Sequence, residues 1–102
     1  MAVVDIMDPE EVGYNGSEDK AREFHFWLNR RASDVTRAKN TLEDFRRARG
    51  RAERGGDTRY NSMSDSCRVV EEVMLATLDN ARRVLDTWLR FEIENDVSYP
   101  ED

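Results

Sequence analysis

Apolar side chains recur along the middle of the chain at alternating intervals of three and four residues. One series repeats every seven residues at Phe24, Arg31, Ala38, Phe45 and Ala52, and a second series falls between its members at Leu28, Val35 and Leu42. This a/d pattern is typical of helices that pack along a seam and predicts a helix over residues 17–53. Arg31 interrupts the apolar series. We expect its stem to lie along the core while its guanidinium reaches water.

A second periodic stretch begins after several serines and predicts a helix over residues 63–96. Its heptad positions are Cys67, Met74, Ala81 and Trp88, interleaved with Val70, Thr77, Val84 and Phe91. Leu78 and Leu85 lie one position further round the helix. The apolar stripe is therefore wider than a two-stranded seam requires.

The two predicted helices are joined by a short polar connection, residues 54–62, that contains adjacent glycines. Short connections between long helices are typical of antiparallel neighbours. The predicted fold is therefore all-α, a helical hairpin over residues 17–98. An irregular acidic tail (1–16) is expected before it and a short acidic tail (97–102) after it.

The wide stripe on the second helix leads us to expect self-association. One partner helix covers only part of such a stripe, and contiguous exposed apolar patches usually mark an interface. A second copy related by a two-fold axis would close a four-helix bundle. The residues predicted for the core and for self-association are Phe24, Trp27, Leu28, Val35, Leu42, Phe45, Val70, Met74, Leu78, Val84, Leu85, Trp88 and Phe91.

Charge is segregated along the chain, although the net charge is only −6. Residues 1–19 carry six acidic and no basic groups, residues 20–54 eleven basic and five acidic, and residues 55–102 five basic and eleven acidic. In a hairpin this makes the turn end basic and the other end acidic. An antiparallel dimer would bring unlike ends together, whereas a parallel dimer would bring like charges together.

The strongest charge cluster lies at the predicted turn and has three interpretations. Its arginines favour the negative end of a helix dipole, or bind an acidic protein partner, or contact nucleic-acid phosphates while an aromatic ring stacks on bases. The sequence pI of about 4.8 is unusual for a dedicated nucleic-acid binder. The candidate partner-binding residues are Arg46, Arg47, Arg49, Arg51, Arg54 and Tyr60.

Catalytic chemistry finds little support in the sequence. Di-metal helical bundles need Glu-x-x-His pairs, and this chain has a single histidine and a single cysteine. His25 is interpreted as a residue at the edge of the stripe and Cys67 as a small buried hydrophobe. No acid, base and nucleophile converge, so we expect no catalytic residue, metal or cofactor.

These features favour a non-enzymatic protein–protein interaction module, an adaptor, inhibitor or small assembly component that acts as a homodimer and binds another protein. The alternatives are a nucleic-acid regulator using the arginine-rich turn, or an acidic nucleic-acid mimic. No apolar run reaches the roughly 20 residues of a membrane span, and the N-terminal residues lack a secretory pattern. We therefore expect no membrane partner and a cytoplasmic location. Fourteen arginines against two lysines are compatible with a bacterial or phage source. For a phage protein, the expected location is inside a virion or a host cell.

Overall fold

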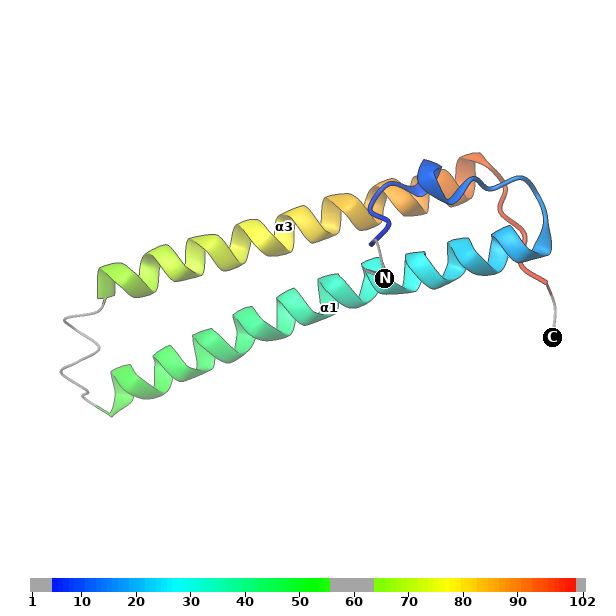
Figure 1. Ribbon diagram of the computed structural model, residues 1–102. Coiled ribbons are helices and arrows are strands. Elements are labelled where there is room, and N and C mark those ends of the chain that lie inside the picture. Colours follow the sequence, from blue (N-terminus) through cyan, green and yellow to red (C-terminus); the bar gives the residue numbers. More distant parts are fainter. Residues whose placement is uncertain (1–4, 56–63, 101–102) are drawn as a thin grey trace.

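The chain folds as a helical hairpin. The computed structural model describes residues 5–55 and 64–100. Two helices, α1 (Glu18–Arg54) and α3 (Ser64–Glu94), run antiparallel, and a short 3-10 helix, η1 (Pro9–Val12), precedes them (Figure 1). The molecule measures 59 × 29 × 27 Å. The predicted all-α hairpin is confirmed, and within the described ranges neither helix has an apolar stretch that would span a membrane.

The ends of the helices follow local hydrogen bonding. At the start of α1, the hydroxyl of Ser17 accepts a hydrogen bond from the backbone N–H of Lys20 at 3.3 Å. Two acidic residues in the first turn complement the positive end of the helix dipole. After α3, Asp96 has a left-handed backbone with a φ of 48°, and the N–H of Val97 donates to the carbonyl of Glu92 at 3.0 Å. This αL residue ends the helix.

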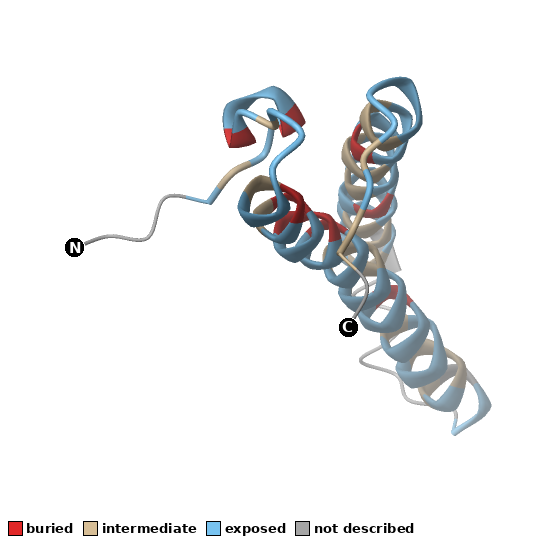
Figure 2. Ribbon diagram, turned by 90° about the vertical axis from the view of Figure 1, so that its right-hand side faces the viewer, coloured by how far each residue is buried: buried red, intermediate tan, exposed pale blue. Residues whose placement is uncertain are grey.

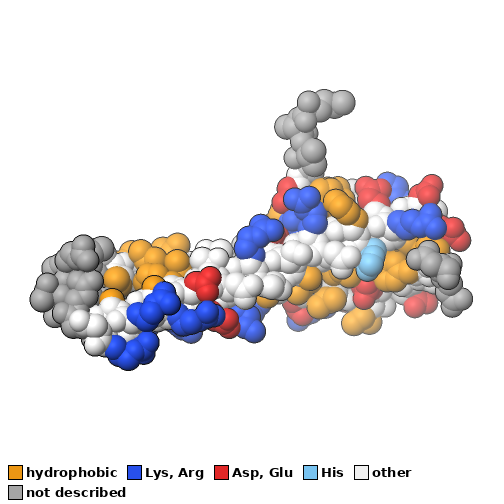
Figure 3. Space-filling view, turned by 90° about the horizontal axis from the view of Figure 1, so that it is seen from below, with side chains coloured by type: hydrophobic (Ala, Val, Ile, Leu, Met, Phe, Trp, Pro, Cys, Tyr) orange, Lys and Arg blue, Asp and Glu red, His pale blue; other side chains and the backbone are white. Residues whose placement is uncertain are grey.

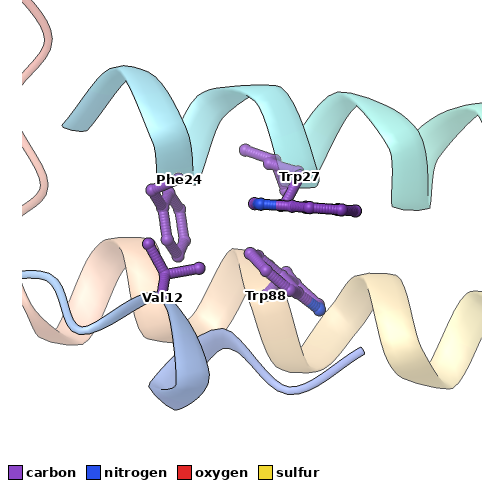
Figure 4. Close-up of a cluster of buried hydrophobic side chains, with 5 residues drawn as sticks. Val12, Phe24, Trp27 and Trp88 are labelled. Carbon is purple, nitrogen blue, oxygen red and sulfur yellow. The ribbon is translucent and has the colours of Figure 1, made fainter. Parts of the chain in front are cut away.

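The best-packed part of the core lies at the open end of the hairpin, where α1 begins and α3 ends. Phe24 and Trp88 are both 0% exposed, and their ring centroids are 5.2 Å apart. Phe91 also stacks on Phe24, with ring centroids 5.4 Å apart, and Trp27 is 7% exposed. Figure 4 shows Val12 reaching this aromatic cluster from η1.

Residues 5–13, which we call the strap, close the cluster from outside. Val12 is 1% exposed, and the indole Nε1–H of Trp88 donates to the backbone carbonyl of Met7 at 2.9 Å. Val97 and Tyr99 pack against the same cluster from beyond α3. The flanking segments therefore cover Phe24, Trp27 and Trp88 within one chain, so these three rings do not by themselves require a second copy.

Burial decreases toward the turn end, where α1 ends and α3 begins (Figure 2). Of the residues predicted for the core, six are buried: Phe24, Trp27, Leu28, Leu42, Leu78 and Trp88. Six are half-buried: Val35, Phe45, Met74, Val84, Leu85 and Phe91. Val70 is 41% exposed. The first half of α3 exposes Val69, Val70, Val73 and Leu75, and Met7, Phe26, Leu89 and Ile93 are exposed elsewhere.

Candidate interaction groove

A groove of about 450 Å³ runs between α1 and α3 on the turn side of the strap. Met7 closes one end, so the groove continues the surface that the strap occupies. Its apolar lining is Met7, Ala38, Val73, Met74, Ala81 and Val84. Its polar lining is Arg31, Asp34, Arg37, Thr41, Thr77 and Asn80. A mostly apolar groove with a few polar groups is the usual form of a recognition site.

Three exposed valines extend the groove toward the turn. Val69, Val70 and Val73 are 58%, 41% and 60% exposed, and we call them the valine face. Their spacing of one, three and four residues places them on one side of a helix. Figure 3 shows hydrophobic side chains beside the basic side chains near the turn end. A patch of this kind next to a groove is typical of an interface.

Arg31 lies in the wall of the groove and is 1% exposed. Its Nη2 donates to both carboxylate oxygens of Asp5, at 2.9 and 3.1 Å, and its Nη1 contacts the Sδ of Met7. Its Nε lies 3.3 Å from a carboxylate oxygen of Asp34, but the Nε–H donates no hydrogen bond to any described residue. The expectation that Arg31 reaches water is wrong, because the strap covers it and supplies its counter-charge.

Two of the candidate partner-binding arginines join the helices. The Nε of Arg46 lies 3.0 Å from one carboxylate oxygen of Glu71 on α3, and Arg49 contacts the other oxygen. Hydrogen bonds from Arg49, and then from Arg46, hold the pKa of Glu71 below its ordinary value. Although their cationic groups are partly accessible, these arginines have a structural role at the turn end.

The other candidate arginines differ in their surroundings. Arg47 pairs weakly within α1, at 3.9 Å from Glu43 and 3.6 Å from Asp44. Arg51 and Arg54 are exposed and form no ion pair with any residue that the structure describes. Tyr60 lies outside the described residues. The arginines that remain available to a partner are therefore Arg47, Arg51 and Arg54.

His25 and Cys67 lie at opposite ends of the hairpin, near the start of α1 and the start of α3 respectively. His25 is exposed, and its ring packs on Tyr99 with centroids 4.9 Å apart. Burial is the main cause that raises the pKa of Tyr99, and the hydrogen bond from its hydroxyl to Glu92 is the second. Cys67 is half-buried rather than buried as expected. Across residues 5–55 and 64–100, no group of three or more His, Cys, Asp or Glu side chains is arranged to hold a metal ion.

No family model, curated protein or solved structure matches the chain, so its own geometry carries the functional argument. Two carboxylates that matter structurally were missed by sequence reasoning. Asp5 is one of several acids in a segment without periodicity, and Glu71 is one of many carboxylates along the second predicted helix. An arginine in a seam position was the available signal, since a buried guanidinium requires an acidic partner.

Proposed function

We propose that this chain is a non-enzymatic protein–protein interaction module that dimerises through the valine face and the adjoining groove. The observation that carries the proposal is the contrast between the two halves of one surface. The strap covers the half at the open end, whereas Val69 and Val73 remain 58% and 60% exposed at the turn end. A second hairpin laid across this half completes a four-helix bundle.

Burial of apolar area supplies the free energy of the proposed association. Burial is worth about 25 cal/mol per Å², and a stable interface removes roughly 800 Å² per partner from water. The valine face alone is too small, but the adjoining groove of each copy adds further apolar side chains to the interface. Because a two-fold axis repeats each contact, every apolar residue in the interface contributes twice.

Charge favours an antiparallel arrangement of the two copies. With the valine faces of the two copies together, an antiparallel arrangement keeps the two basic turn ends apart, whereas a parallel arrangement brings them side by side. Exposed ion pairs are individually weak and are screened by salt. They bias the orientation of the copies, while apolar burial supplies the affinity.

A pair of aspartate substitutions on α3 tests the dimer. Val73→Asp places a charge on the valine face, whereas Ile93→Asp places one on the same helix at a residue that is 77% exposed and does not line the groove. Sedimentation equilibrium should find dimers for the wild type and Ile93→Asp, and monomers of unchanged helicity for Val73→Asp. Equal masses for the two variants would refute the proposed interface.

A nucleic-acid regulator is the second candidate, and the exposure of Arg47, Arg51 and Arg54 favours it. Its test is duplex and single-stranded DNA binding as a function of salt, comparing the wild type with a triple alanine variant of these residues. Arg46 and Arg49 are left intact because they hold Glu71. The acidic-mimic alternative has less support, since Asp79 and Asp86 pair with Arg83 and Arg90, each at 2.9 Å.

A further inference from the structure

The strap contacts the hairpin in the way that a bound peptide contacts a receptor. Asp5 supplies a carboxylate to the buried Arg31, with two hydrogen bonds of 2.9 and 3.1 Å. Met7 supplies a backbone carbonyl to the indole of Trp88. Val12 supplies an apolar anchor that is 1% exposed. Residues 5–7 have no regular secondary structure, and the four-residue η1 follows them.

The strap joins α1 through a short segment with two glycines in the left-handed region. Gly13 has a φ of 71° and Gly16 a φ of 86°, and a Cβ added at either position would meet no atom within 4 Å. These glycines permit backbone rotation at little steric cost. The strap is therefore tethered by a segment that can accommodate its release.

The surface under the strap selects the chemistry of whatever lies on it. Arg31 is 1% exposed, and a buried guanidinium without a carboxylate is strongly unfavourable. Arg30 lies 3.9 Å from the same Asp5 carboxylate, and Arg37 lines the open half of the groove. Beside these cations lie the Phe24–Trp88 cluster and the apolar side chains of the groove. An occupant must combine an acidic group with apolar side chains.

We propose that the strap is an intramolecular pseudo-ligand, and that an acidic, apolar peptide segment of another protein displaces it. The partner's carboxylate pairs with Arg31, and its apolar side chains cover the aromatic cluster. The strap lowers the apparent affinity for the partner, because only the fraction of chains with a released strap is competent to bind. This inference concerns a second protein and the open end, so it stands independently of the proposed dimer.

A labelled peptide with the sequence of residues 5–13, DIMDPEEVG, tests the proposal against the full-length chain. Asp5→Ala weakens the strap, and Asp86→Ala removes an exposed carboxylate elsewhere as the matched control. Fluorescence anisotropy should give at least tenfold tighter binding to Asp5→Ala than to the wild type or Asp86→Ala. A peptide in which the aspartate corresponding to Asp5 is replaced by asparagine should bind Asp5→Ala at least tenfold more weakly. Equal affinity for all three chains, or for both peptides, would overturn the proposal.

A second measurement uses the wild-type chain, so the test does not depend on how well Asp5→Ala folds. A saturating concentration of the unlabelled peptide should accelerate hydrogen exchange at the strap amides, because the strap is displaced, while exchange in the middle of α1 stays unchanged. Unaltered exchange in the strap would overturn the proposal. Sedimentation of the same samples separates this result from the dimer, since peptide binding should survive in Val73→Asp.

Discussion

Asp5 and Arg31 lie 26 positions apart in the sequence, yet the Asp5 carboxylate receives both Nη2 hydrogen bonds of the Arg31 guanidinium, which lies in the wall of the groove. The pair fixes the N-terminal segment across the hairpin and neutralises a charge in the seam between α1 and α3. The same contact determines where the covered half of the groove ends and the open half begins.

Removing the Asp5 carboxylate should destabilise the fold. Asp5→Ala leaves Arg31 with only the weaker contact to Asp34, and we expect a loss of roughly 1–3 kcal/mol, less than for a fully buried pair because Asp5 is half exposed. Urea unfolding followed by circular dichroism measures the loss. Asp86→Ala, which breaks an exposed pair within α3, should cost less than about 0.5 kcal/mol. Similar losses in the two variants would contradict this role for Asp5.

Trp88→Phe should separate the hydrogen bond of the strap from its packing. The phenyl ring retains most of the apolar contact but cannot donate to the carbonyl of Met7, so we expect about 1 kcal/mol beyond the packing loss. Trp27→Phe is the matched control, because Trp27 packs in the same cluster without such a bond among the described residues. Equal losses of stability for the two variants in thermal unfolding would contradict a stabilising Trp88–Met7 hydrogen bond.

The stability of the turn end should depend on pH through Glu71. Its pKa is lowered in the folded chain, so its contribution is present above the ordinary carboxyl pKa and is lost as the pH falls through the lowered value. The wild type should be more stable than Glu71→Gln at neutral pH, and the difference should vanish in acid. Glu72→Gln, on the exposed neighbour, should show a smaller difference. A gap between the wild type and Glu71→Gln that persists unchanged in acid would contradict this account.

The arginines of the turn should fall into two groups. Alanine at Arg46 and Arg49 together should destabilise the hairpin, because Glu71 loses both of its partners. Alanine at Arg47, Arg51 and Arg54 should leave helicity intact and change the unfolding free energy by no more than about 0.5 kcal/mol at each position. Differential scanning calorimetry of the two variants makes the comparison, and a larger loss in the second group would reverse the assignment.

The hairpin itself was predictable, because heptads such as Leu28–Val35–Leu42 encode a local, repeating contact that the sequence displays directly. The strap was not. Its contacts join Asp5 to Arg31 and Met7 to Trp88, and no periodicity marks a pairing between an irregular segment and a helix. The ion pairs of Glu71 were not predictable for a related reason, since its place between two arginines depends on the register in which α3 packs on α1.

The strap changes which residues favour a dimer. Phe24 and Trp88, which were predicted for the core and for self-association, are covered within one chain. Val70, a predicted stripe residue that is 41% exposed, and its neighbours Val69 and Val73 now favour the second copy. Periodicity shows which residues share a face, but not which other segment of the chain covers that face.

The absolute mass of the full-length chain in solution, measured by light scattering on a sizing column at low and high salt, tests the central claim most directly. The account predicts twice the chain mass of 11.9 kDa at both salt concentrations, because apolar burial rather than exposed charge supplies the affinity. A mass of 11.9 kDa at both concentrations would contradict the homodimer.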